Sequence, residues 1–154
     1  MKYFLWIMAL ALLFSCSPKV VEVAPAVPKN VYEQVEWETG VSQYLLQAIA
    51  ITESSENDAV VGDGGKSKGR MQINERYRTY YVEKFGEYNP HDTTDAVRLA
   101  AKIILTNYQY FNDLNKAIAS YRQGIKGVEK YGVHDWYVKK VLKTMQNLID
   151  KSKI

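Results

Sequence analysis

The sequence predicts an all-α domain in which one glycine-rich loop interrupts a series of helices. Apolar residues recur at helical spacing over residues 92–111 and again over residues 138–149. Convincing alternation of apolar and polar residues, the pattern of a half-buried strand, extends over only a few residues at a time. Four of the nine glycines lie in one run, at positions 62, 64, 65 and 69. A vestigial hairpin in this loop is the departure from helix that we expect.

The helix that ends near residue 53 organises the rest of the chain. Leu45, Ile49 and Glu53 are spaced at i, i+4 and i+8, so a helix places all three on one face. Burial on an apolar face raises the pKa of a carboxyl toward the range that a general acid needs near neutral pH. Alternatively, Glu53 ends a fraying helix and faces solvent, as most charged residues do.

Capping and breaking residues place the N-terminal helices. Residues 31–39 form a short helix that Gly40 ends, and Ser42 can cap the helix that carries the glutamate. After the glycine-rich loop we expect an aromatic-rich helix that ends at Phe85, before Gly86.

The sequence predicts three further helices in the C-terminal half, with a glycine-containing break before the last one. Asp92 is a favourable N-cap for a long central helix that extends to Phe111. A helix over residues 113–122 follows, and Gly124 and Gly127 are expected to break the chain after it. The closing helix carries an apolar stripe of Val138, Val141, Leu142, Met145, Leu148 and Ile149.

The aromatic-rich stretch has two interpretations. Aromatic side chains at helical spacing usually pack into a core. They also form sugar-binding clefts, because pyranose rings stack on aromatic faces and sugar hydroxyls need amphipathic neighbours. Both roles are compatible with the five residues concerned, which are Tyr77, Tyr80, Tyr81, Phe85 and Tyr88.

The N-terminal residues are typical of an exported lipoprotein. Residues 1–15 combine one lysine with an apolar run too short to span a bilayer, which indicates a secretory signal peptide. The run ends at Leu-Phe-Ser before Cys16, the only cysteine, and this resembles a bacterial lipobox. Residues 16–30 hold three of the four prolines and form a tether, and residues 31–154 form the domain. We therefore expect a lipid on Cys16 and a place in the cell envelope, on the outer membrane facing the periplasm.

Charge and motif content argue against several other classes of partner. The formal net charge of +3 is too small and too dispersed for a nucleic-acid-binding protein. His91 and His134 are far apart in the chain, so a metal site has little support. The chain has no phosphate-binding motif. We expect no cofactor.

Four short motifs follow one another along the chain. They are Glu53 with Ser54, Gly-Arg-Met-Gln at residues 69–72, Ser-Tyr-Arg-Gln-Gly at residues 120–124, and Tyr137. Over residues 31–145 their order and spacing resemble those of the lytic transglycosylases of the lysozyme superfamily. The family motifs read Glu-Ser, Gly-Leu-Met-Gln and Ala-Tyr-Asn-Ala-Gly, so Arg122 stands where that family has Asn. The resemblance implies a lysozyme-like helical fold.

The resemblance also implies a reaction. A lytic transglycosylase cleaves the β-1,4 bond between N-acetylmuramic acid and N-acetylglucosamine in peptidoglycan and leaves a 1,6-anhydro sugar. Glu53 would act first as general acid and then as base, without the second carboxylate that most glycosidases use. Five further residues are implied around it: Ser54 to orient the acid, Met71 and Gln72 to line the cleft, and Tyr121 and Tyr137 to hold the acid or the sugar.

Two alternative functions remain open. Residues 62–67, Gly-Asp-Gly-Gly-Lys-Ser, resemble the Gly-Asp-x-Gly-x-Ser segment of invertebrate-type lysozymes, in which Asp63 would be the second carboxylate of a hydrolase. The other interpretation is that Asp63 is only a turn residue, because Asp-Gly is a common turn pair. The other alternative is an inactive lipoprotein that binds glycan or an envelope partner, although a binder has no use for an acid on a buried face.

Overall fold

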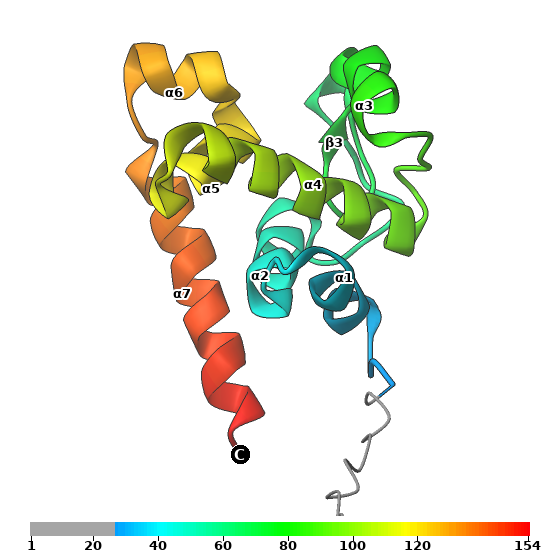
Figure 1. Cartoon of the computed structure of the whole chain (residues 1–154), viewed down its shortest axis with the longest axis vertical. Coiled ribbons are helices and arrows are strands. Elements are labelled where there is room, and N and C mark those ends of the chain that lie inside the picture. The colour runs from blue at the N-terminus through cyan, green and yellow to red at the C-terminus, as the bar shows by residue number, and fades with distance from the viewer. Residues whose placement is uncertain (1–26) are drawn as a thin grey trace, which may run out of the picture.

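The computed structural model describes residues 27–154, which form seven α-helices and one small sheet (Figure 1). The all-α prediction is confirmed. The expected signal peptide and Cys16 lie outside the described residues. Between residues 27 and 154, no helix is both long and apolar enough to cross a membrane. The helices are α1 (Val31–Thr39), α2 (Gln43–Ser54), α3 (Arg78–Phe85), α4 (Thr93–Phe111), α5 (Leu114–Gln123), α6 (Ile125–Tyr131) and α7 (Asp135–Ser152), and the strands are β1 (Val61–Gly62), β2 (Ser67–Lys68) and β3 (Ile73–Asn74).

Several helix boundaries are explained by capping residues. The side chains of Asn30, Asp92 and Asp113 each accept a hydrogen bond from the backbone N–H of the third residue of their helix. Gly40 ends α1 in the left-handed conformation, with φ at 75°. Ser42 occupies the N-cap position of α2, but its side chain accepts no hydrogen bond there. The prediction of a Ser42 cap is therefore wrong, and α2 is held instead by the burial of its apolar face.

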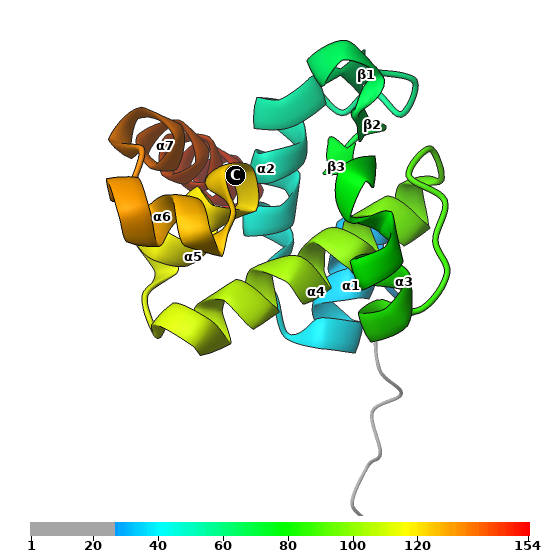
Figure 2. The same ribbon diagram turned by 90° about the horizontal axis from the view of Figure 1, so that it is seen from above.

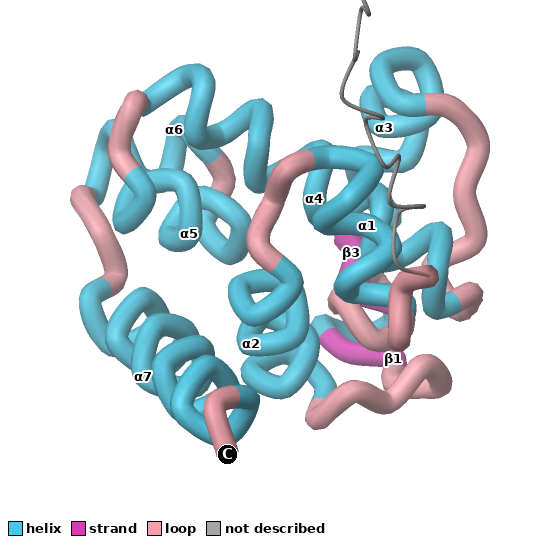
Figure 3. Tube along the Cα trace, turned by 60° about the horizontal axis from the view of Figure 1, so that its bottom comes forward, coloured by secondary structure: helices cyan, strands magenta, loops and turns pink. Residues whose placement is uncertain are grey.

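Helix α2 lies at the centre of the molecule. Its residues Leu45, Leu46 and Ile49 are each at most 4% exposed, and fully burying such a side chain is worth about 1.5–3 kcal/mol. α7 runs alongside α2, while α1 and α4 pack on its other sides (Figures 1 and 3). α4 is the long central helix that the sequence predicts over residues 92–111. Packing on several sides therefore fixes the position of the last turn of α2.

A small antiparallel sheet follows α2 in the chain. Its three strands are ordered β1-β2-β3, with Val61 opposite Lys68 and Ser67 opposite Asn74. The expected hairpin corresponds to β1 and β2, and the sheet has a third strand, β3, directly after the glycine-rich run. In Figure 2 the sheet lies on one side of α2 and α7 lies on the other. The C-terminal end of α2 is consequently flanked by the sheet and by α7.

Helix α6 departs from the sequence prediction. Gly124 separates α5 from α6 as expected, with φ at 73°. Gly127, however, lies inside α6 and does not break the chain. A glycine inside a helix costs about 1 kcal/mol relative to alanine. The neighbouring Val128 is only 4% exposed, so its burial offsets that cost.

Candidate active site

The Glu53 carboxyl lies in the last turn of α2 and is largely enclosed. Its side chain is 10% exposed, so the interpretation of Glu53 as a fraying, solvent-facing residue is wrong. The Tyr137 hydroxyl donates a hydrogen bond of 2.5 Å to Glu53 Oε1, and Arg122 Nη1 lies 4.0 Å from Glu53 Oε2. Burial raises the pKa of Glu53, and the Tyr137 hydrogen bond and the Arg122 charge offset only part of that rise. Such a carboxyl can hold a proton and release it to a substrate.

Tyr137 approaches Glu53 from the first turn of α7. The residue is completely buried, and burial, followed by the charge of Glu53, raises its pKa far above the usual value. Its hydroxyl therefore stays protonated and remains a hydrogen-bond donor to the carboxyl. The sequence identified Tyr137 as a site residue, and the structure shows its contact with the acid.

Tyr121 holds the backbone beside the acid. Its hydroxyl donates a 2.7 Å hydrogen bond to the carbonyl oxygen of Met71. Burial, and then the negative charge of Glu53, raises the pKa of Tyr121, so this hydroxyl also stays protonated. The side chain of Met71 is fully buried in the core, so the expectation that it lines a cleft is wrong. The backbone of Met71 is the part that contributes, because it anchors Tyr121.

Ser54 connects α2 to the loop rather than to the acid. Its hydroxyl donates to the carbonyl oxygens of Arg70, at 2.7 Å, and Ala50, at 3.3 Å, and accepts from the backbone N–H of Asn57. Among residues 27–154, the Ser54 hydroxyl forms no hydrogen bond to Glu53, and its expected role in orienting the acid stays a prediction. Ser54 instead fixes the loop next to the turn that carries Glu53.

The glycines of the loop permit close approach of backbone and side chains. Gly69 has φ at 71°, and a Cβ added there would collide with the carbonyl group of Pro90. A Cβ at Gly62 would collide with Gln72 Oε1. Gln72 Nε2 donates to the carbonyl oxygens of Val60, at 3.2 Å, and Gly69, at 2.9 Å. The Gly-x-Met-Gln motif thus closes the loop on itself.

Asp63 lies on the exposed tip of this loop. It occupies a 3-10 turn (Asp63–Gly65) with φ at 51°, and its Oδ2 accepts a 2.6 Å hydrogen bond from the Ser67 hydroxyl. The negative charge of Asp63 is a minor contribution to the raised pKa of Glu53, well after burial. Asp63 is therefore within electrostatic reach of the acid, and its carboxylate is already bonded to a loop hydroxyl.

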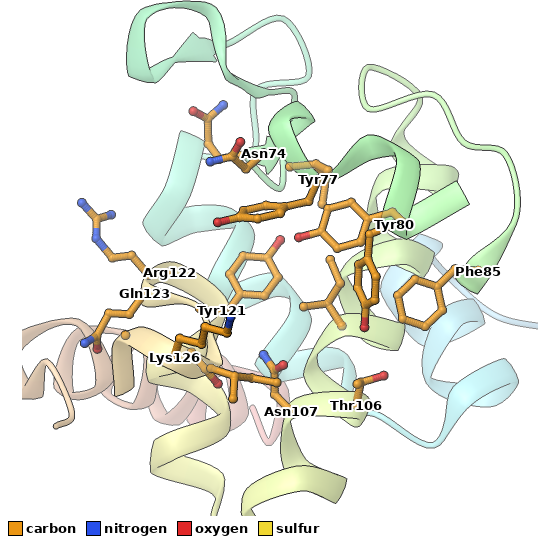
Figure 4. A pocket seen from close by; sticks show the side chains of 18 residues that line it. Asn74, Tyr77, Tyr80, Phe85, Thr106, Asn107, Tyr121, Arg122, Gln123 and Lys126 are labelled. Carbon is orange, nitrogen blue, oxygen red and sulfur yellow. The ribbon is translucent and has the colours of Figure 1, made fainter. Parts of the chain in front are cut away.

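A cavity of about 580 Å³ is lined by residues from β3, α3, α4, α5 and α6, and by Gln72 of the loop. Glu53 does not line this cavity, but Arg122, whose Nη1 lies 4.0 Å from Glu53 Oε2, does. Figure 4 shows Tyr77, Tyr80 and Phe85 on one side of it and Arg122 and Gln123 on the other. Tyr77 and Tyr80 are each about half exposed and line the cavity. Tyr81, Phe85 and Tyr88 pack against the core, as the first interpretation of the aromatic stretch expects. Sugar binding by the exposed rings of Tyr77 and Tyr80 stays a prediction.

Arg70 holds the glycine-rich loop in place through hydrogen bonds to Asp58 and Tyr32. The sequence alone did not identify it as a functional residue. Its Nε and Nη2 donate to the two carboxylate oxygens of Asp58, each at 2.9 Å, and its Nη1 donates to the Tyr32 hydroxyl at 3.1 Å. The hydrogen bond from Arg70 lowers the pKa of Asp58. Thr93 donates a further hydrogen bond to Asp58 Oδ2. This network ties the loop to α1 and to the start of α4, and nothing in the spacing of these residues predicts it.

Trp136 contacts both Arg122 and Tyr137 and belongs to none of the four sequence motifs. It is 56% exposed, and the guanidinium carbon of Arg122 lies 5.1 Å from its ring centroid. Its position directly before Tyr137 is the signal that would have identified it. Within residues 27–154, no group of three or more His, Cys, Asp or Glu side chains is arranged to hold a metal ion.

Comparison with known proteins agrees with this architecture. The family model described as the transglycosylase SLT domain matches residues 30–140. No curated protein matches the chain. The matched region extends from the cap of α1 into α7 and contains Glu53, the loop, Tyr121 and Tyr137. The chain therefore belongs to the transglycosylase SLT domain family, the lytic transglycosylases of the lysozyme-like superfamily.

Proposed function

We propose that this protein is a lytic transglycosylase that cleaves the β-1,4 bond between N-acetylmuramic acid and N-acetylglucosamine in peptidoglycan. The family places its substrate among the glycan strands of peptidoglycan. The observation that carries the proposal is the Glu53 carboxyl, which is 10% exposed, has a raised pKa and accepts a hydrogen bond from Tyr137. A carboxyl in this state is suited to general acid catalysis near neutral pH.

In the first step Glu53 acts as general acid. It gives its proton to the glycosidic oxygen, and the bond from the muramyl C1 to that oxygen breaks, which releases the N-acetylglucosamine 4-hydroxyl. The substrate's own N-acetyl group stabilises the positive charge at C1. Glu53 becomes a carboxylate, and the Tyr137 hydroxyl stabilises the new charge because hydrogen bonds to charged groups are the stronger ones.

In the second step the same residue acts as base. The Glu53 carboxylate takes the proton from the muramyl 6-hydroxyl, whose oxygen forms a bond to C1 and gives the 1,6-anhydro product. Glu53 ends the cycle protonated, and no water is consumed. Arg122 lies 4.0 Å from Glu53 Oε2 and favours the carboxylate that exists between the two steps.

A lysozyme-type hydrolase is the second candidate. Its support is Asp63, whose charge contributes to the raised pKa of Glu53 and which therefore lies within electrostatic reach of the acid. In that mechanism Asp63 would guide a water to C1. Against it, Asp63 sits on an exposed turn, and its Oδ2 is bonded to Ser67 at 2.6 Å.

Mass spectrometry of muropeptides separates these candidates. Purified peptidoglycan is digested with the parent and with Asp63→Asn, and the ends of the product strands are identified. We expect anhydromuramyl ends from both proteins, whereas a hydrolase would give reducing ends that are heavier by one water and would lose activity with Asp63→Asn. Intact strands from a folded parent would favour the inactive glycan-binding lipoprotein.

We further propose that the domain of residues 31–154 acts at a membrane surface. A lipid on Cys16 would hold it there through the tether of residues 16–30, on the outer membrane facing the periplasm. The support is the sequence Leu-Phe-Ser-Cys at residues 13–16, where the apolar N-terminal run ends.

A further inference from the structure

Arg122 has an unusual environment for an arginine beside a glutamate. Its guanidinium carbon lies 5.1 Å from the ring centroid of Trp136 and 5.6 Å from that of Tyr137. Cation–π contacts of this kind orient the planar guanidinium while leaving its N–H groups free. The side chain is 48% exposed and lies at the edge of the cavity (Figure 4).

The guanidinium N–H groups of Arg122 form no hydrogen bond to an acceptor among the residues that the structure describes. Its one carboxylate neighbour there is Glu53, at 4.0 Å, which is too long for a hydrogen bond. By contrast, Arg70, Arg78 and Arg98 each donate hydrogen bonds to carboxylates. The guanidinium of Arg122 is thus held in place by two aromatic rings, lies next to the acid and has donors free to bind a ligand.

The charge of Arg122 is least balanced when the site is ready to receive substrate. On the proposed function, Glu53 is then protonated and neutral. A guanidinium fork with free donors fits a carboxylate, which can accept two parallel hydrogen bonds from it. An asparagine, which the family pattern has at this position, could form a hydrogen bond but could not supply charge.

We propose that Arg122 binds a carboxylate carried by the muramyl residue beside the scissile bond and so determines which glycan strands are preferred. The proposal rests on the proposed function of this site. Two sources supply such a carboxylate in peptidoglycan. One is the lactyl group of a muramyl residue without a peptide, and the other is an acidic residue of an attached stem peptide.

Three soluble glycan strands distinguish these sources. The first keeps its stem peptides, the second has had them removed by an amidase and so carries free lactyl carboxylates, and the third is the second with those carboxylates converted to amides. Each strand is tested with the full-length parent, Arg122→Gln and Arg122→Lys. Lys130→Gln is the matched control, because the Lys130 ammonium also lies over an aromatic ring, that of Tyr131 at 4.9 Å, but does not line the cavity.

We expect Arg122→Gln to lower kcat/KM on the preferred acidic strand by roughly tenfold relative to the amide strand, mainly through KM. Arg122→Lys should recover part of the preference, and Lys130→Gln should keep all of it. A loss on the amidase-treated strand identifies the lactyl carboxylate, and a loss confined to the strand with stems identifies the peptide. Removal of Arg122 also changes the pKa of Glu53, but that effect is common to all strands and cancels in the ratio.

Measurements of glycan binding without cleavage show whether the Arg122 proposal fails independently of the proposed function. Dissociation constants for the three strands are measured by calorimetry in the Glu53→Gln background, with and without Arg122→Gln. If no strand is cleaved by the parent but Arg122→Gln still removes the preference for the acidic strand in binding, the transglycosylase assignment fails and the Arg122 site stands. An unchanged ratio of acidic to amide strand, in both kcat/KM and binding, would overturn the proposal.

Discussion

At the scale of the residue, the proposed chemistry depends on opposing effects on the pKa of the Glu53 carboxyl. Burial raises the pKa of Glu53, while the Tyr137 hydroxyl and the Arg122 charge act in the opposite direction. The first effect favours the protonated acid at the start of the cycle. The other two favour the carboxylate that, in the proposed mechanism, exists between the two proton transfers. One residue can thus serve as both acid and base.

We predict that Glu53→Gln abolishes cleavage without unfolding the domain. The amide cannot give a proton to the glycosidic oxygen, and loss of general acid catalysis alone costs roughly 10²- to 10⁴-fold. Packing on Leu45 and Ile49 should survive, because the amide is nearly isosteric with the acid. Turbidity loss of purified cell walls measures the activity, and the melting temperature measures the fold. A folded variant within about tenfold of the parent would refute the role of Glu53.

The same variant tests the sign of the pKa shift. A carboxyl whose pKa is higher in the folded than in the unfolded state stabilises the fold fully below its unfolded pKa of about 4.3. That contribution is lost as the pH rises through the folded pKa, and the Gln variant has no such titration. The melting temperature of Glu53→Gln minus that of the parent should therefore increase from about pH 4 to neutral pH. A difference independent of pH would contradict the raised pKa.

We predict that Tyr137→Phe lowers kcat and shifts the alkaline limb of the pH–rate profile to higher pH. The hydrogen bond from Tyr137 lowers the pKa of Glu53, so its removal raises that pKa further. Hydrogen bonds to charged groups contribute about 1.5–3 kcal/mol, which corresponds to a loss of at least roughly tenfold. Tyr110→Phe is the control, because its hydroxyl donates to Glu129 on the surface. Unchanged kcat and an unchanged profile would make Tyr137 a packing residue.

At the scale of the element, the last turn of α2 and the glycine-rich loop act as one unit. Ser54 bonds to the Arg70 carbonyl, and Arg70 bonds in turn to Asp58. The next residue in the chain, Met71, accepts the hydrogen bond from Tyr121 in α5. The loop therefore couples the acid-bearing helix to the helix that carries Arg122.

We predict that Gly69→Ala destabilises the domain more than Gly64→Ala does. Both glycines have left-handed φ values, 71° and 63°, which cost a non-glycine residue about 1–2 kcal/mol. Only Gly69 approaches the carbonyl of Pro90, whereas Gly64 has no atom within 4 Å of its added Cβ. Urea unfolding should show a loss of about 1 kcal/mol for Gly64→Ala and at least about twice that for Gly69→Ala. Equal losses would mean that the loop moves freely away from Pro90.

At the scale of the whole molecule, the proposed anchor at Cys16 would limit how far the domain can act from a membrane. Residues 17–30 are fourteen residues, and a fully extended chain of this length spans at most roughly 50 Å. A domain anchored at Cys16 would therefore reach only glycan strands near the membrane surface.

We predict that Cys16→Ser releases the protein from membranes or blocks its processing. A serine cannot accept the thioether-linked lipid that would hold the domain at the bilayer. Fractionation of cells that express the parent and the variant measures the effect. If the variant is processed to the size of the parent and still sediments with membranes, the anchor lies elsewhere.

The sequence by itself determined the features that depend on local periodicity and backbone chemistry. Helical spacing placed Leu45, Ile49 and Glu53 on one face, and the capping preference of Asp92 located the start of α4. Both are properties of neighbouring residues, which is why they can be predicted without the fold. Local preference failed at Gly127, because the burial of Val128 outweighs the low helix propensity of glycine.

Only the tertiary structure decided which groups meet the acid. Tyr137 bonds to Glu53 across 84 positions of the chain, and Tyr121 to Met71 across 50. Motif order predicted that these tyrosines belong to the site, but not which oxygen atom each one contacts. The Ser54 hydroxyl donates to the Arg70 carbonyl, and the Met71 side chain is buried in the core. Such contacts are fixed by the relative positions of whole elements, and no spacing within one segment carries that information.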